Sequence, residues 1–200
     1  MTSAETETLA TLRARLEQLE ARQRYIDDRL SIHECLWRYC RGLDRHDEAL
    51  EASAFWPDAQ INYGHAFSGS LADFIAWGNQ GHDSFFDMHQ HHLTNVTVDF
   101  DGDRAHVESY LINLMRRKDG LLDIGGARYI DLFERRDGAW RILIREYLPD
   151  VRTQGPATVT GLGLPPSGPG RWDKGDLSYL RPLPRRPADD PAAAAWRKKR

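Results

Sequence analysis

The sequence lacks the features that define several large protein classes. It has two cysteines among 200 residues, Cys35 and Cys40. They lie five residues apart in a helix-like segment and so on different helical faces, which argues against a disulfide between them. No apolar run approaches the length of a membrane span or a signal-peptide core, so we expect a soluble, cytoplasmic protein. A phosphate loop and a glycine-rich dinucleotide turn are also missing, which argues against a nucleotide cofactor.

The sequence also lacks a large net charge. The formal net charge is −3, too small to indicate nucleic acid or an acidic substrate as a partner, although the last residues, 196–200, are locally basic. We expect that basic end to be solvated. The apolar content of 40% is enough for one domain with a sizeable core and for extensions, but not for a second full domain.

Residues 4–30 have the spacing of an amphipathic helix. Apolar side chains recur at alternating steps of three and four, with Gln23 as the polar interruption. The apolar positions are Leu9, Leu12, Leu16, Leu19, Ile26 and Leu30. Such a seam has to be buried against a second surface. It either pairs with a copy of itself, as a dimer or trimer, or braces its own domain, and we favour the oligomer contact over residues 1–30.

Residues 31–150 predict an α+β domain in which helices come first and a curved, mostly antiparallel sheet follows. Ser31 and Glu34 resemble a capping box, which predicts a new helix from Ile32. Gly42 predicts that this helix ends and that Asp44 turns inward. The further elements expected are a helix over 47–55, a strand over 59–64, a helix over 70–78, a loop over 81–88, and strands over 95–100, 104–115, 126–136 and 139–148.

Two of these strands carry polar residues whose direction matters. Alternation puts Asn113 on the face of Leu111, and Arg145 on the face of Leu143 and Tyr147. By pattern alone, Arg145 can point into a cavity or into solvent.

The chain changes composition after Arg152. Gly, Pro, Thr and Ser become frequent and no periodic segment returns, so residues 151–200 predict an irregular extension that is disordered from Pro182. The piece 171–180 either packs over the cavity mouth, packs on a neighbouring subunit, or remains a surface tail.

A cluster of histidines is the strongest chemical signal. His89, His91 and His92 lie just before a strand-like run, and imidazole changes its charge near neutral pH. We interpret His91 as a general base and Asp44 as the carboxylate that fixes its tautomer. The alternatives are a surface cluster, a metal site or simply the start of a strand.

Taken in order, these parts of residues 31–150 resemble the SnoaL-like branch of the NTF2-like superfamily. That branch includes scytalone dehydratase, hexachlorocyclohexane dehydrochlorinase and bile-acid 7α-dehydratase, with ketosteroid isomerase more distant. The resemblance rests on Tyr39 with Gly42-Leu43-Asp44, on His91 to Asn95 entering a strand, on the turn Asp101-Gly102-Asp103 followed by Ala105, and on Arg145 in the last strand. It implies a cone in which the sheet wraps around the helices.

The resemblance also implies a cofactor-independent lyase or isomerase that acts on a small hydrophobic cyclic substrate such as a steroid, an aromatic compound or a polyketide. His91, oriented by Asp44, would remove a proton from carbon, while Tyr39 and Arg145 would hydrogen-bond the oxygen that gains charge or departs. The apolar walls expected are Trp56, Tyr63, Phe74, Trp77, Phe85, Phe86 and Tyr110.

Other interpretations stay open at this point. The same cone could bind a ligand or a protein without catalysis, because fold does not fix function. A metal held by His89, His91 and His92 is less favoured, since neighbouring residues of a strand point to opposite sides, although Asp44 could supply a further ligand. A one-residue slip of the strand would exchange the roles of His91 and His92.

Overall fold

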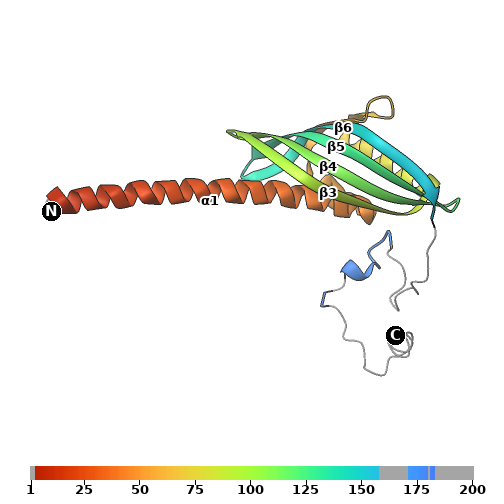
Figure 1. Cartoon of the computed structure of the whole chain (residues 1–200), viewed down its shortest axis with the longest axis horizontal. Coiled ribbons are helices and arrows are strands. Elements are labelled where there is room, and N and C mark those ends of the chain that lie inside the picture. The colour runs from red at the N-terminus through yellow and green to blue at the C-terminus, as the bar shows by residue number, and fades with distance from the viewer. Residues whose placement is uncertain (1–2, 158–170, 180, 183–200) are drawn as a thin grey trace, which may run out of the picture.

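The most prominent features of the structure are one long helix, α1 (Ser3–Asp44), and a curved sheet that packs over the second half of this helix (Figure 1). The computed structural model describes residues 3–157, 171–179 and 181–182. Its elements are α1 (Ser3–Asp44), α2 (Glu48–Ala52), β1 (Phe55–Asn62), β2 (Ser68–Ser70), α3 (Leu71–Phe85), β3 (Phe86–Asp101), β4 (Arg104–Arg117), β5 (Leu121–Arg136), β6 (Ala139–Pro156) and the short 3₁₀ helix η1 (Leu177–Tyr179).

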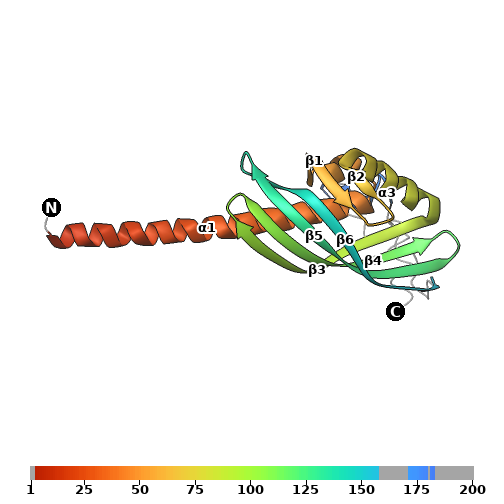
Figure 2. The ribbon, with the colours of Figure 1, turned by 90° about the horizontal axis from the view of Figure 1, so that it is seen from above.

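The sheet has six strands in the order β2-β1-β6-β5-β4-β3. Only the pairing of β1 with β6 is parallel, and every other neighbouring pair is antiparallel. The long strands curve over the second half of α1, and α3 lies beside β1 and β2 at one end (Figure 2). The expected α+β cone is therefore confirmed. None of the described helices is both long and apolar enough to cross a membrane.

Helix α1 runs without a break from Ser3 to Asp44, so the predicted new start at Ile32 is wrong. The sequence before Gly42 contains no glycine or proline that would break a helix. A serine such as Ser31 can stand inside a helix, because its helix propensity is only slightly unfavourable. The second half of α1 is held by packing, because Ile32 and Tyr39 are completely buried in the core. Tertiary contacts thus outweigh the local capping signal.

The first half of α1 projects away from the sheet (Figures 1 and 2). All six apolar seam positions, from Leu9 to Leu30, are exposed. The alternative in which this seam braces its own domain is therefore wrong.

Other boundaries move because tertiary pairing extends the elements. The helix expected over 47–55 ends at Ala52, and the strand expected over 59–64 already begins at Phe55, which pairs with Ile142 of β6. The expected loop over 81–88 is also wrong: α3 continues to Phe85, and β3 begins at Phe86. Strand β6 continues to Pro156, past the change in composition at Arg152. The expectation of disorder falls on residues outside the described part of the chain, except Pro182.

Arg145 points into the protein because of a bulge in β6. Leu132 pairs with Ile144 whereas Phe133 pairs with Ile142, which leaves Leu143 as the extra residue. The bulge shifts the alternation, so Arg145 shares the buried side with Ile142 instead of with Leu143. The reading of Arg145 as a solvent-facing arginine is wrong.

The guanidinium of Arg145 is fully buried and forms an ion pair with Asp131 on the neighbouring strand. Two hydrogen bonds of 2.8 and 2.7 Å join them, and both side chains have no exposed surface. Arg145 Cζ also lies 4.2 Å from the ring centroid of Tyr39 and 4.0 Å from that of Tyr129. The charge is therefore compensated by a carboxylate and by two aromatic faces.

We expect Asp131→Asn to lower the free energy of unfolding by about 3–5 kcal/mol, because it leaves the buried charge of Arg145 without its partner. Urea denaturation measures this loss. The double variant Asp131→Leu/Arg145→Met should recover most of the stability. Arg104→Ala is the control, since its ion pair with Glu134 is exposed on the arginine side and should change stability by less than about 1 kcal/mol. A similar small change for Asp131→Asn would contradict the assignment.

Glu51 of α2 is a second buried acid, and it packs where α1 ends. A Cβ atom at Gly42 would lie 2.4 Å from the backbone nitrogen of Glu51, so only glycine allows α2 this close to α1. Gly42 thus serves close packing as well, while α1 ends at Asp44, close to where Gly42 predicted the end. Burial raises the pKa of Glu51 to about 8, and the charge of Arg145 lowers it in part.

Glu51 should make the protein less stable as the pH rises from about 4.5 to about 8. In this window the unfolded chain loses the proton of Glu51 while the folded chain keeps it, so the folded state binds more protons. We expect Glu51→Gln to be more stable than the wild type at pH 9 and to lose this advantage at pH 4.5. Thermal unfolding across this range checks it, and a stability difference that is independent of pH would refute it.

Candidate active site

A cavity of about 660 Å³ opens between α1, α3 and the concave side of the sheet. Its walls are mostly aromatic and apolar, with a polar group at a few points. Five of the seven predicted wall residues line it, namely Tyr63, Phe74, Trp77, Phe85 and Phe86. A volume of this size suits a small cyclic molecule.

His91 and Asp44 are in contact at this cavity. His91 Nδ1 lies 2.7 Å from Asp44 Oδ1, and the backbone N–H of His91 donates to both carboxylate oxygens at 3.1 Å. Because a carboxylate accepts hydrogen bonds, Nδ1 carries the ring proton and Nε2 keeps a lone pair. The sequence therefore paired the right two side chains, while their catalytic role stays a prediction.

The neighbouring histidines take different directions along β3. His92 is exposed, as expected for the residue that follows an inward one. His89 is completely buried and lies within hydrogen-bond distance of the Leu43 carbonyl oxygen, at 2.9 Å from Nε2. Among the three, only His91 lines the cavity. The possible slip of register did not occur, and the three histidines do not meet at one point.

Tyr39 and Arg145 lie close together but differ in their access to the cavity. Tyr39 lines it, and its hydroxyl is 3.3 Å from that of Tyr63. Burial raises the pKa of Tyr39 well above its ordinary value, so its hydroxyl remains a proton donor. Arg145 lies behind the rings of Tyr39 and Tyr129, paired with Asp131, and is not among the cavity-lining residues described. The structure does not place its guanidinium where it would hydrogen-bond a bound molecule.

Two predicted wall residues lie elsewhere. Trp56 Nε1 donates to the carbonyl oxygen of Glu134 at 2.9 Å, and the Arg141 guanidinium covers its ring. Tyr110 is exposed, because it alternates with the buried Leu111 on β4. Neither residue lines the cavity in the described part of the chain. Both predictions were wrong for the same reason: aromatic character does not indicate which side of a strand faces inward.

Sequence reasoning did not assign seven polar or aromatic residues to the cavity, namely His82, Asn113, Arg117, Asp123, Tyr129, Tyr147 and Arg152. Asn113 is the strand partner of His91, and the alternation had already put it on the buried face of β4. Tyr147 stacks on Tyr63 with ring centroids 4.5 Å apart. His82 was not found because its segment was predicted as a loop.

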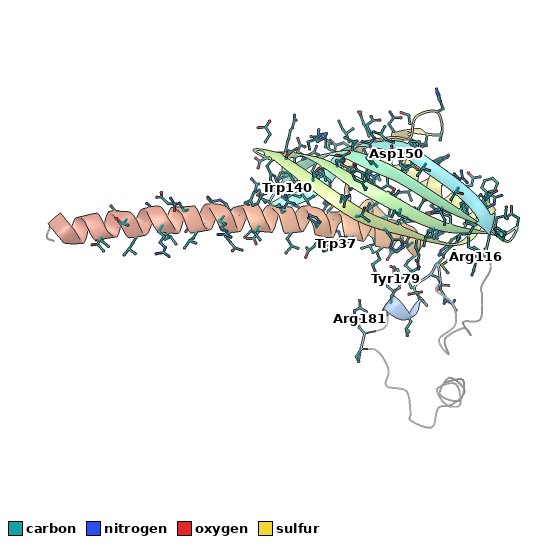
Figure 3. All side chains as sticks on the ribbon, viewed as in Figure 1. Trp37, Arg116, Trp140, Asp150, Tyr179 and Arg181 are labelled. Atoms are coloured by element: carbon teal, nitrogen blue, oxygen red, sulfur yellow. The ribbon has the colours of Figure 1, made fainter. Side chains whose placement is uncertain are left out.

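The piece 171–179 packs against the end of α1, below the sheet in Figure 3, where Tyr179 is labelled. The hydroxyl of Tyr179 donates to Asp47 at 2.8 Å, and the ring of Trp172 stacks on His46 with centroids 4.2 Å apart. No residue of this piece lines the cavity. None of the three alternatives for 171–180 describes this arrangement, because the described residues 171–179 pack on the end of α1 and on His46 rather than over the cavity mouth.

Several solved structures share this fold. A candidate scytalone dehydratase from Novosphingobium aromaticivorans DSM 12444 is 25% identical, with a TM-score of 0.58 over 64% of this chain and 88% of that one. A hexachlorocyclohexane dehydrochlorinase, LinA-type3 from Novosphingobium barchaimii LL02, is 20% identical, with a TM-score of 0.62 over 71% and 97%. A candidate aromatic ring hydroxylase from Novosphingobium aromaticivorans is 23% identical, with a TM-score of 0.58 over 65% and 94%.

A search of curated proteins found no match. The family comparison is positive: residues 24–146 match the model of the SnoaL-like domain, more than half of the chain. This range contains the end of α1 with Asp44, the strand with His91, and all but the last part of the sheet. The chain therefore belongs to the SnoaL-like domain family, within the NTF2-like superfamily.

Proposed function

We propose that this protein is a lyase or isomerase that moves a proton on a small hydrophobic cyclic substrate, with His91 and Asp44 as the reacting pair. The observation that carries the proposal is the hydrogen bond between Asp44 and His91 Nδ1 at the wall of an aromatic cavity. The side chain of His91 is 5% exposed. Its lone pair at Nε2 can therefore act with little competition from bulk water.

In the proposed reaction, His91 Nε2 takes a proton from a carbon next to a carbonyl group or next to the carbon that bears a leaving group. The electron pair of the broken C–H bond then forms a double bond, and either the carbonyl oxygen gains charge or hydroxide or halide departs. Asp44 stabilises the imidazolium that forms. For a departing hydroxide, the proton on His91 completes the water molecule; for a departing halide, His91 releases it to solvent after the product leaves. For an isomerisation, it returns to another carbon.

Tyr39 and Tyr63 are the donors proposed for the oxygen that gains charge. Both line the cavity, and burial raises the pKa of Tyr63 to about 12, so both hydroxyls keep their protons in the ground state. Arg145 is proposed as a positioning residue, because the rings of Tyr39 and Tyr129 lie between it and the cavity. The names of two structural relatives, a dehydratase and a dehydrochlorinase, denote losses of water and hydrogen chloride and agree with this reaction class.

Asp44→Asn and His91→Gln should each lower kcat by about 10²–10⁴-fold, because the first change removes the carboxylate and the second removes the base. The test measures turnover of a panel of hydroxylated and chlorinated cyclic compounds. The double variant should be no slower than the worse single variant, since the two residues act as a unit. His92→Gln is the matched control: it alters the neighbouring exposed histidine and should leave kcat unchanged.

Circular dichroism shows whether each variant is folded. If His91→Gln is folded and retains full turnover, the proposed base is wrong. If the wild type binds members of the panel in the cavity but converts none, the protein is a binding module of the same fold, which is the alternative that fold alone leaves open.

A further inference from the structure

Three imidazole rings from three different elements meet beside the candidate active site. His46 follows the end of α1, His82 belongs to α3 and His89 belongs to β3. The ring centroids of His82 and His89 are 4.3 Å apart, and those of His46 and His89 are 5.4 Å apart. One ring nitrogen of each histidine lies within 4.8 Å of one from each of the others. The three rings are thus close enough for small side-chain movements to bring one nitrogen of each onto a shared ion.

Each of these rings has a buried nitrogen without a hydrogen-bond partner. The atoms are His46 Nε2, His82 Nδ1 and His89 Nδ1. Buried polar atoms in folded proteins are almost always paired, so three such atoms in one place require an explanation. On His89 the opposite nitrogen, Nε2, lies 2.9 Å from the Leu43 carbonyl oxygen, which fixes Nδ1 as the atom with the lone pair.

The surroundings of the cluster resemble the second layer of a metal site. Metal-bound histidines usually donate their other N–H to a carbonyl or carboxylate. Leu43 plays this part for His89, and Asp83 Oδ1 lies 3.6 Å from His46 Nδ1. Burial lowers the pKa of all three histidines, that of His89 to about 4, so the rings are neutral and able to ligate at neutral pH.

Two further features close the cluster. His46 has a left-handed backbone with φ of +48°, a strained conformation for a residue other than glycine that holds its ring among the others. The ring of Trp172 stacks on His46 and lies 4.7 Å from His89, which separates the cluster from solvent on that side.

We propose that His46, His82 and His89 together bind one divalent transition-metal cation, with Zn²⁺ as the best match. Imidazole nitrogen suits zinc, copper, nickel and iron rather than magnesium or calcium. Three histidines leave one zinc position open, and the ring of His82 also lines the cavity. This set differs from the one considered from sequence: it shares His89, but His91 belongs to the pair with Asp44 and His92 faces outward.

The metal site does not depend on the proposed reaction, and it is tested by binding alone. Protein without an affinity tag is stripped with a chelator and titrated with Zn²⁺ against a coloured competitor, and with Co²⁺ followed by its visible absorption. We expect one equivalent bound, with a dissociation constant below about 1 μM. His82→Phe and His46→Asn should each weaken binding more than tenfold. Asparagine tolerates the left-handed backbone, so His46→Asn removes a ligand without disturbing the turn.

Matched controls separate this site from other histidines. His65→Gln and His92→Gln, both at exposed positions, should bind the metal as the wild type does. His91→Gln should also retain it. Absence of stoichiometric binding by the wild type would refute the site and leave an internal water as the partner of these nitrogens. A second group of described side chains, Asp44, His89 and His91, is also close enough to hold an ion. If His91→Gln loses the metal while His82→Phe keeps it, the ion binds to that second group and the proposal is overturned.

A second, independent observation concerns the exposed seam of α1. Leu9, Leu16, Gln23 and Leu30 occupy one position of a seven-residue repeat, and Leu12, Leu19 and Ile26 occupy the position three residues later. At 100° per residue, the seam position Leu30 and the exposed Trp37 lie on the side of α1 opposite to the buried Ile32 and Tyr39. Trp37 points away from the sheet in Figure 3. The α1 helix of a second copy can therefore pack on the seam while the sheet of each copy lies on the outer side of the helix pair.

The charges beside the seam specify how a second copy would align. In a parallel pair, Arg15 of one chain would face Glu20 of the other, and Arg22 would face Asp27, so opposite charges meet. In an antiparallel pair, the arginine-rich edge formed by Arg15, Arg22 and Arg29 would face itself. In proteins, helical stability comes mostly from packing of an amphipathic face rather than from propensity, which gives a partner a further role. We propose that two copies of this chain associate through a parallel coiled coil over residues 9–30.

Light scattering after gel filtration tests the association in the full chain. We expect a dimer for the wild type and a monomer for Leu16→Glu/Leu19→Glu. Ala14→Glu/Ala21→Glu places the same charges on the outer face of the helix and should remain a dimer. Leu9→Cys should form an interchain disulfide on oxidation, because only a parallel pair brings the two Cys side chains together. A monomeric wild type, a trimer, or the absence of this crosslink would overturn the proposal.

Discussion

The end of helix α1 is tied to strand β3 by two histidine contacts, and the site depends on them. Asp44 accepts hydrogen bonds from the backbone and ring of His91, and the Leu43 carbonyl oxygen lies 2.9 Å from His89 Nε2. The last carbonyls of a helix have no partner within the helix, and His89 lies within hydrogen-bond distance of one of them, the Leu43 carbonyl oxygen. One junction therefore joins the end of α1 to β3 and orients the candidate base.

Buried charge beneath the cavity shapes its chemistry. The ion pair of Arg145 with Asp131 is completely enclosed, and the rings of Tyr39 and Tyr129 cover the guanidinium. Because Arg145 is paired and covered, the cavity presents the hydroxyls of Tyr39 and Tyr129 above it, while Arg117 and Arg152, both paired with Asp123, line another part of the wall. Such a surface accepts an apolar molecule and donates a hydrogen bond where oxygen gains charge.

The fold was largely predictable because its signals are periodic. The seam of α1, the helix–sheet order and the two hairpins at Asp101-Gly102 and Asp137-Gly138 follow from spacing and turn residues. The errors share a cause, since each involved an element that neighbours extend or shift. Helix α1 passes Ser31 because the core holds its second half, and β6 reaches Pro156 because β5 pairs with it. The bulge at Leu143 has no signature in the alternation of its strand.

The sequence by itself determined that residues 9–30 present an apolar seam, and it offered His91 and Asp44 as a candidate pair, which the resemblance to the SnoaL-like branch supported. The seam is a property of residue type and spacing, which survives errors of a few residues in the boundaries. Only the tertiary structure decided that Arg145 pairs with Asp131, that Trp56 and Tyr110 lie outside the cavity, and that His46, His82 and His89 converge. These outcomes depend on register, on a bulge and on contacts between distant elements, and no local pattern encodes them.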